Sequence, residues 1–552
     1  MRPTLVSLAI PFVLLVALAP ANADPPPSGL QILPGVSHPR GGAKLYTDAS
    51  GNVSALGLLS YGSIWQMNRV TPDGDNLPGW PAMGVQFGMD LGAETDCVAD
   101  DGAGGSWHVR QLVQAPTRRI ELEHLLANAT SGWNGLVISG NFVYNPAVAN
   151  DGGTGAFVSW WSGASMGSLK LLRVQANGVA QPGWSATGAT VLSLSGDFPE
   201  DSGPPMLPDG SGGVFVLANC YQGIHLVRVN GAGAYPSGWG SAGLLLTALN
   251  QQPAPATGLA QCDASHVFAW WLVDDRVVMR RVAIDGSADA AWDAGVEMIP
   301  AGLGLSDVSV VPDGLGGALV LARTSGPGVR LMHVQGGGSP APGFEGGAIS
   351  PLDNEAVMRG YVSDVVRVAA GSDGGAIVCW DDMRAGDEGV RARWLLADGA
   401  SDPNEPVHGR RIVVSTVDLS ASLMAAMGDG EGGAYVQWQD QNATGWDRVF
   451  LVRAQAGAFL GVPPGAGNGL ALAAGPNPVR GELTVRFTLP DARPARLELL
   501  DLAGRRVAAR DVRGDGAHAE RLGEAAALPP GVYLLRLTHG TQVGTARVAL
   551  VR

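Results

Sequence analysis

The chain has 552 residues, of which 46% are hydrophobic and only 16% are charged, and its formal net charge is −14. This composition supplies ample material for a folded core and excludes a disordered chain. The acidic balance, without any run of lysine or arginine, argues against a nucleic-acid partner, because a negative surface repels phosphate backbones. The 80 glycines and 37 prolines fall at regular turns, which is typical of an all-β protein.

Residues 1–23 have the features of a secretory signal peptide. Arg2 gives a positive start, an apolar stretch runs from 5 to 18, and Ala21-Asn22-Ala23 fits a small-x-small cleavage site. We therefore expect the mature chain to begin near Asp24 and to be exported. No later segment approaches about 18 unbroken apolar residues, so we expect no transmembrane span in the mature chain.

One short phrase then recurs eight times, namely an aspartate- or glycine-rich turn followed by β-forming residues. The copies start at Asp48, Asp101, Asp151, Asp209, Cys262, Asp313, Gly371 and Asp429. The ends of successive copies are 50 to 58 residues apart. A period near fifty residues indicates a repeat architecture.

Each repeat predicts four short strands. An apolar strand precedes the turn and a second follows it, as in 434–438; a third ends in Arg-Val, as at Arg173-Val174. A Gly-Trp turn such as Gly183-Trp184 leads to a short fourth strand. Four strands in about fifty residues make one blade of a β-propeller, in which neighbouring blades cover each other's faces.

The eighth unit predicts how the ring closes. It reaches 449–453 and then lacks a fourth strand, whereas 29–34 resembles the fourth strand at 295–300. We therefore predict a propeller over 24–456 with eight four-stranded blades, in which the N-terminal strand completes the last blade. Seven blades are the alternative if the irregular second unit is not a blade.

The fifteen tryptophans suggest a carbohydrate platform, but nine of them recur at two positions of the repeat. Residues that repeat with the blade are predicted to pack between blades. These nine are Trp80, Trp133, Trp160, Trp184, Trp239, Trp271, Trp292, Trp380 and Trp438. The better candidates for an exposed platform are Trp65, Trp107, Trp161, Trp270, Trp394 and Trp446.

No catalytic, cofactor-binding or metal-binding residue emerges from the sequence. Paired acids at 100–101, 274–275 and 381–382 are interpreted as turn formers, with Ca²⁺ as the alternative. The nine histidines show no metal-ligand spacing. The four cysteines are interpreted as buried thiols, with a Cys220–Cys262 bridge as the alternative.

After a Gly/Pro/Ala-rich linker at 457–470, the tail 471–552 predicts a small β-sandwich. Its motifs are a Pro-Asn-Pro, a D-x-x-G-R-x-V turn and an L-x-x-G-x-Y-x-L-R-L strand. The motif residues are Pro476, Asn477, Pro478, Asp501, Gly504, Arg505, Gly531, Tyr533 and Arg536. This series resembles the C-terminal sorting domain of type IX secretion cargo, an Ig-like domain, and is also similar to the Ig-like domain of flagellar hook-capping proteins.

The resemblance implies recognition of the tail by the type IX secretion machinery of the outer membrane and a secreted or cell-surface location. We expect a non-catalytic binding or adhesion module whose ligand is a surface polysaccharide or a protein. The alternative is a propeller enzyme that acts on polysaccharide as a glycoside hydrolase, a sialidase-like enzyme or a lyase. The repeat units themselves match neither the sialidase Asp-box nor the quinoprotein docking pattern.

Overall fold

A computed structural model describes residues 30–550 apart from short gaps, of which the longest are 195–202, 357–364, 414–420 and 460–471. The chain divides into two compact units, Met1–Gly461 and Val462–Arg552. The predicted signal peptide, 1–23, lies outside the described residues, as does most of the predicted linker. Within the described part of the chain, no helix is long and apolar enough to cross a membrane.

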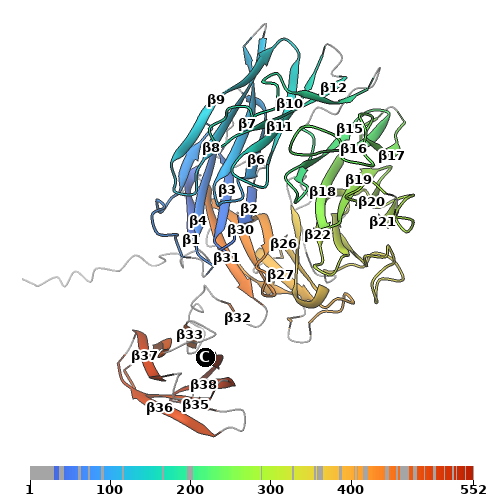
Figure 1. The fold of residues 1–552 in the computed structure, drawn as a ribbon. Helices are drawn as coiled ribbons and strands as arrows, with labels where there is room; N and C mark the ends of the chain where they lie inside the picture. The colour runs from blue at the N-terminus through green and yellow to red at the C-terminus, as the bar shows by residue number, and fades with distance from the viewer. Residues whose placement is uncertain are drawn as a thin grey trace, which may run out of the picture. The chain divides into compact units, whose positions relative to one another are not determined.

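The first unit is a β-propeller of eight antiparallel sheets, which we call blades 1 to 8 (Figure 1). The first strands of successive blades contact one another from blade 2 through to blade 8, and again between blade 8 and blade 1, so they lie innermost. Blades 1 and 2 comprise β2 (Ala43–Thr47), β3 (Val53–Leu59), β4 (Ile64–Val70), β5 (Val85–Phe87), β6 (Ala93–Asp100), β7 (Ser106–Gln114), β8 (Thr117–Leu125) and β9 (Ser131–Gly140). Blades 3 and 4 comprise β10 (Val143–Asn150), β11 (Ala156–Ser162), β12 (Ser168–Val174), β13 (Ala189–Ser193), β14 (Met206–Pro208), β15 (Val214–Asn219), β16 (Gly223–Val229) and β17 (Leu244–Ala248).

The second half of the ring repeats this plan. Blades 5 and 6 comprise β18 (Ala256–Asp263), β19 (His266–Val273), β20 (Arg276–Ala283), β21 (Val296–Ile299), β22 (Ser306–Pro312), β23 (Ala318–Arg323) and β24 (Val329–Val334). Blade 7 comprises β25 (Val366–Ala370), β26 (Ala376–Asp382), β27 (Gly389–Leu395) and β28 (Arg410–Arg411), with a 3-10 turn, η1 (Ser372–Gly374), between its first two strands. Blade 8 comprises β29 (Ser422–Gly428), β30 (Gly433–Gln441), β31 (Asp447–Gln455) and β1 (Leu30–Val36), and β32 (Ala458–Phe459) also pairs with β31.

The predicted closure is confirmed, because β1 pairs antiparallel with β31. Leu30 lies opposite Leu451 and Gln31 lies opposite Phe450, so the start of the chain supplies the fourth strand of blade 8. The irregular second unit is a full blade with the longest strands, of 9, 9 and 10 residues, so the count is eight and not seven. Blade 6 departs from the plan, because its fourth strand is reduced to a bridge between Leu331 and Ile349.

The core lies between the blades. Every residue of β15, β23 and β26 is buried, because a second strand has a neighbouring blade on each of its faces. Four repeating tryptophans lie on the second strands of blades 3, 5, 7 and 8, with exposed fractions of 0 to 2%: Trp160, Trp271, Trp380 and Trp438. The prediction that they pack between blades is therefore confirmed.

The second unit is a β-sandwich of two sheets. One sheet has the order β33 (Leu472–Gly475), β34 (Glu482–Leu489) and β37 (Gly516–Glu524). The other has the order β36 (Arg506–Val512), β35 (Ala495–Leu500), β38 (Gly531–His539) and β39 (Gln542–Leu550). Apolar residues of both sheets, such as Val485, Leu497 and Leu535, form one buried core.

Candidate functional site

The turn between the first and second strands of a blade is built around its aspartate. In blade 3 the backbone N–H groups of Gly153 and Gly155 donate to Asp151 Oδ1 at 2.9 and 3.0 Å. The same pair of bonds, from the residues two and four positions on, occurs at Asp101, Asp209, Asp313 and Asp429. The last glycine of the turn is required by close approach, since a Cβ on Gly155 would collide with the carbonyl oxygen of Val174.

The second carboxylate oxygen of each of these aspartates binds a basic side chain from the third strand of the same blade. Arg173 donates to Asp151 at 2.9 Å, Arg228 to Asp209 at 2.7 Å and Arg453 to Asp429 at 2.9 Å. His124 and His333 take this position in blades 2 and 6, each 3.0 Å from Asp101 or Asp313.

In seven of the eight blades these basic side chains also link the blade to the next one, and we call the arrangement the latch. Arg173 donates to the carbonyl of Gly231 in blade 4 at 3.1 Å, and Arg228 donates to Ile284 in blade 5 at 2.6 Å. The remaining links run from Arg69 to Ala127, His124 to Ala176, Arg281 to Gly336, His333 to Ala397 and Arg453 to Pro72. The last link joins blade 8 to blade 1, so it closes the circle.

The tryptophans of the Gly-Trp turns reinforce the latch. The indole Nε1 of Trp184 donates to the same Gly231 carbonyl as Arg173, at 2.9 Å. Trp80, Trp239 and Trp292 make the equivalent bond to Ala127, Ile284 and Gly336. In blade 7 the turn begins with Gly371 instead of aspartate, and Trp394 donates to Gly432 of blade 8 at 3.0 Å.

The latch lowers the pKa of Asp101, Asp209 and Asp313. Burial alone raises the pKa of Asp209, but the N–H groups of Ser211 and Gly213 and the Arg228 guanidinium together hold that pKa below its ordinary value. The pKa values of Asp101 and Asp313 are likewise lowered against the effect of burial, in both cases with a histidine as donor. A carboxyl group held in this way is a structural charge and a poor proton donor.

The histidine latch of blade 6 predicts a pH dependence. Burial alone lowers the pKa of His333, but the Asp313 carboxylate and the Ala397 carbonyl raise it above the ordinary histidine value. The stabilising charge is therefore fully present below about pH 6.5 and is lost as pH rises through the folded-state pKa. We expect the melting temperature of the wild type, relative to that of His333→Arg, to fall as the pH rises above about 6.5, in thermal melts followed by circular dichroism. A constant difference between the two proteins would contradict this assignment.

The tryptophans outside the repeat positions do not form an exposed platform, so that prediction is wrong for four of them. Trp65, Trp107, Trp161 and Trp394 are at most 5% exposed. Trp107 stacks on the latch residue His124, with 3.7 Å between ring centroids, which explains why a buried ring occurs there. Trp270 is partly buried and Trp446 lies outside the described residues.

The paired acids each have structural partners. Asp101 belongs to the latch, and Asp275 accepts the backbone N–H groups of residues 302–305. Asp382 binds Arg384 and Arg391, while Asp381 accepts the N–H of Leu423 in blade 8. In the part of the chain that the structure describes, no three His, Cys, Asp or Glu side chains are grouped as a metal site.

All four cysteines are free thiols, so the Cys220–Cys262 bridge is wrong. Cys220, Cys262 and Cys379 are buried and Cys97 is partly buried, which agrees with their interpretation as small core residues. Burial is the main cause that raises the pKa of both Cys262 and Cys379 to about 12. These two thiols are therefore protonated and unreactive at neutral pH.

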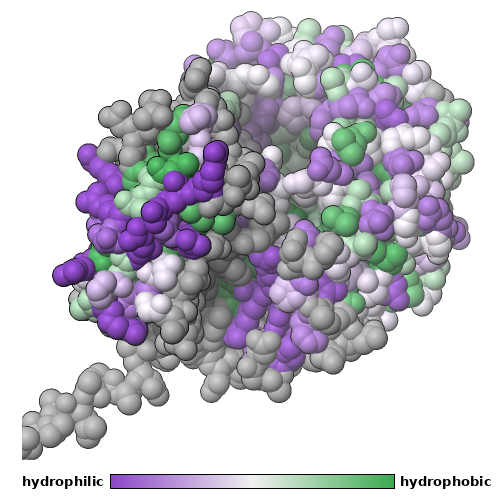
Figure 2. Space-filling model, turned by 90° about the horizontal axis from the view of Figure 1, so that it is seen from below, coloured by the Kyte–Doolittle hydropathy of each residue, from purple (hydrophilic) through white to green (hydrophobic). Residues whose placement is uncertain are grey.

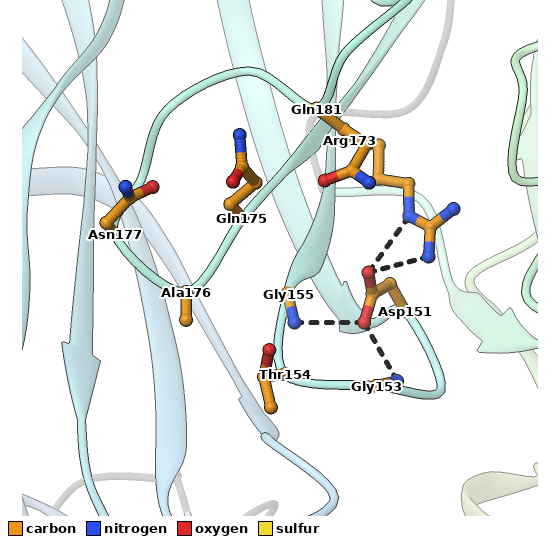
Figure 3. A pocket seen from close by; sticks show the side chains of 9 residues that line it. All are labelled: Asp151, Gly153, Thr154, Gly155, Arg173, Gln175, Ala176, Asn177 and Gln181. Atoms are coloured by element: carbon orange, nitrogen blue, oxygen red, sulfur yellow. Dashed lines mark hydrogen bonds and ion pairs between the residues drawn. The ribbon is translucent and has the colours of Figure 1, made fainter.

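A pocket that the sequence did not predict lies in blade 3 and has a volume of about 440 Å³ (Figure 3). It lies between the Asp151 turn and the turn that follows β12. Its lining consists of Asp151, Gly153, Thr154, Gly155, Arg173, Gln175, Ala176, Asn177 and Gln181. A signal was present in the sequence, because the third copy of the repeat has Thr154 where most copies have glycine.

The surface around the ring is mixed in character. Large hydrophobic side chains such as Leu136, Val179, Leu245 and Leu315 are at least half exposed, but each belongs to a different blade. On the face seen in Figure 2, hydrophobic residues form small groups separated by hydrophilic ones. Single exposed apolar residues of this kind are normal for protein surfaces, whereas the polar pocket is a local feature.

In the tail, four motif residues lie within the described chain. Tyr533 is buried and its hydroxyl donates to the Pro529 carbonyl at 2.8 Å, and Gly531 pairs with Leu550. Arg536 donates to Glu498 at 2.6 Å, and this hydrogen bond is the main cause that lowers the Glu498 pKa. Arg505 is exposed, directly before β36. The other five, Pro476, Asn477, Pro478, Asp501 and Gly504, lie outside the described residues.

Residues 475–550 match the family of secretion system C-terminal sorting domains. This match confirms the type IX sorting tail, and it shows that the protein is exported to the cell surface or the medium. A search of curated proteins finds no match.

Several solved structures share a fold likeness with this chain. A puromycin hydrolase structure is 12% identical, with 72% of this chain and 58% of that chain covered and a TM-score of 0.37. Prolyl oligopeptidase B from Galerina marginata is 9% identical, with coverages of 73% and 55% and a TM-score of 0.39. NanB sialidase from Streptococcus pneumoniae is 10% identical, with coverages of 78% and 71% and a TM-score of 0.35. The chain spans 55 to 62% of the length of the first three structures it matches, and no activity is inferred from them.

Proposed function

We propose that this protein is a non-catalytic binding module, in which the tail delivers a rigid propeller to the cell surface or the medium through the type IX secretion machinery. The latch carries this proposal. It commits the recurring acids of the described turns to ion pairs with arginine or histidine, and it lowers the pKa of Asp101, Asp209 and Asp313. A general acid needs the opposite, namely a raised pKa and a mobile proton.

The export step relies on a signal peptide at 1–23 and on an Ig-like tail. The sheet orders β33–β34–β37 and β36–β35–β38–β39 fit a seven-stranded sandwich of that class. The bond from the Tyr533 hydroxyl to the carbonyl four residues upstream fits the tyrosine corner that such domains share. Both observations support an Ig-like sorting domain that folds around its own core.

Export is tested by removing the tail. We expect a chain that ends at Gly461, with its signal peptide retained, to stay in the periplasm, whereas the full chain reaches the surface or the medium. Residues 462–552 fused to a periplasmic reporter should carry it outside. Immunoblots of cell fractions, with a resident periplasmic protein as the control for lysis, measure both results. Equal export of the chain without its tail would contradict the proposal.

One observation favours the alternative, an enzyme that acts on polysaccharide. Burial and the neighbouring Asp101 raise the pKa of Asp100, which also accepts a hydrogen bond from Asn150 in blade 3 at 2.9 Å. A raised carboxyl pKa is what a general acid requires. Release of reducing ends from polysaccharide by the full chain, abolished by Asp100→Asn, would establish the enzyme and exclude the binding module.

A further inference from the structure

The pocket in blade 3 lies where the repeat loses its symmetry. The fourth residue of the turn is a glycine with φ between 85° and 94° in blades 2, 4, 6 and 8, namely Gly104, Gly212, Gly316 and Gly432. In blade 3 the residue is Thr154, which has no positive φ and is exposed, so its hydroxyl is added to the rim of the pocket. The turn still keeps both hydrogen bonds to Asp151, so the change alters the surface and not the latch.

A second departure lies on the other side of the pocket. A backbone carbonyl accepts the N–H of the aromatic residue in each of these Gly-Trp turns. The residue that supplies this carbonyl is Leu77 in blade 1, Pro236 in blade 4, Asp289 in blade 5 and Ala341 in blade 6. In blade 3 it is Gln181, whose carbonyl makes the same bond to Trp184 at 2.9 Å. The backbone role is therefore conserved around the ring, while blade 3 presents a side-chain amide to the pocket.

The lining is polar but carries no unbalanced charge. The Asp151 carboxylate is engaged by Arg173 and by two backbone N–H groups, so the two opposite charges at the base neutralise each other. Asn177 accepts a backbone N–H at 3.2 Å through its oxygen, which leaves its amide N–H₂ as a donor. Gln175 donates to the Ala180 carbonyl at 3.3 Å, which leaves its side-chain oxygen as an acceptor.

From this geometry we propose that the blade-3 pocket binds a neutral saccharide. A mixture of amide and hydroxyl groups that both donate and accept matches sugar hydroxyls, each of which also does both. In Figure 3 the side chains of Thr154, Gln175, Asn177 and Gln181 surround one open space beside the Asp151–Arg173 pair. A volume of about 440 Å³ falls within the range of about 300–1,000 Å³ that is usual for small-ligand sites.

The lining residues also determine how tightly the pocket should bind a saccharide and whether it should prefer a neutral or an anionic one. No aromatic ring is among the nine lining residues, so hydrogen bonds that compete with water carry the binding. We expect a dissociation constant on the order of 1 mM for one oligosaccharide. An anionic sugar should bind more weakly, because the guanidinium of Arg173 is already engaged by Asp151 and Gly231.

The inference rests on the proposed binding function and names its ligand class. The test uses saturation-transfer NMR on the full chain with neutral trisaccharides of glucose, mannose and xylose, and with a uronic-acid trisaccharide. Gln181→Leu introduces the residue of blade 1, and Thr154→Gly restores the common turn residue. Gln335→Leu is the matched control, because Gln335 begins the equivalent turn of blade 6 with the same backbone bond as Gln175. Unchanged melting temperatures establish that the variants fold.

The expected result is binding of at least one neutral trisaccharide, weakened at least tenfold by Gln181→Leu or Thr154→Gly and unaffected by Gln335→Leu. Binding that ignores the blade-3 variants, a preference for the uronic acid, or no neutral binding at all would overturn the inference. Adhesion of the full chain to cells or to polysaccharide is measured separately. If adhesion persists in the blade-3 variants, the proposed function stands and only this pocket assignment is lost.

Discussion

Replacing Arg228 with methionine is expected to lower the free energy of unfolding of the propeller by about 3–5 kcal/mol, the usual result of removing one partner of a buried ion pair. The Asp209 side chain is 0% exposed and Arg228 is its only cation, at 2.7 Å, among the described residues. Without Arg228 the carboxylate remains buried without a counter-charge, and blade 4 also loses its 2.6 Å bond to the Ile284 carbonyl of blade 5. Both effects act at one interface between blades.

A second variant separates charge burial from lost packing. Asp209→Asn combined with Arg228→Met removes both charges, so it should recover part of the stability that Arg228→Met alone loses. Arg276→Met is the surface control, since Arg276 and Asp274 are 41% and 77% exposed and such pairs contribute about 1 kcal/mol or less. Denaturant unfolding followed by tryptophan fluorescence measures all three proteins. Equal losses for Arg228→Met and Arg276→Met would contradict a structural role for the latch.

Deletion of β1, residues Leu30–Val36, is expected to leave the ring open and to cause aggregation. The strand supplies the fourth strand of blade 8, and Ile32, which is 0% exposed, packs there with Val449 and Leu451. Its loss exposes these side chains and the free edge of β31, which is a template for pairing with other chains. Truncating Ile32 alone to alanine should cost about 2–5 kcal/mol.

The deletion is best tested by adding the strand back. A synthetic peptide with residues 28–37 should bind the shortened chain by strand addition and restore monomers in size-exclusion chromatography. The same peptide with Ile32→Asp should fail, because it would bury a charge in an apolar cluster. Shortened chains that stay monomeric and as stable as the full chain without any peptide would show that β1 does not close the ring.

The sequence period was sufficient to predict the architecture because every blade must meet the same two physical requirements. A strand buried on both faces needs apolar residues, and a tight turn that approaches a carbonyl needs glycine, so both signals recur with the period. The resemblance of 29–34 to 295–300 located the closing strand for the same reason. Blade 6 shows where this prediction fails. Its fourth strand is reduced to the bridge from Leu331 to Ile349, and no sequence motif predicts that reduction.

The candidate site was much less predictable than the fold. The sequence predicts an exposed platform from the tryptophans outside the repeat positions, yet Trp107 stacks on His124 and Trp394 donates to the Gly432 carbonyl. Neither ring is therefore available as an exposed ligand platform. The pocket depends on Thr154 and Gln181, which are 27 residues apart and meet only after the strands β11 and β12 have formed a hairpin. A single sequence carries no sign that these two positions face the same space.

The latch also has a direction, since the arginine or histidine of a blade reaches forward to the carbonyl of the following blade. Each of these blades therefore offers a side-chain donor to the following blade and a backbone carbonyl to the preceding one. Duplication or loss of one unit of about fifty residues would therefore bring together a donor and an acceptor that already fit. Recombination between copies should preserve this match for units that carry the aspartate turn and a basic third-strand residue, but not for blade 7, whose turn begins with Gly371.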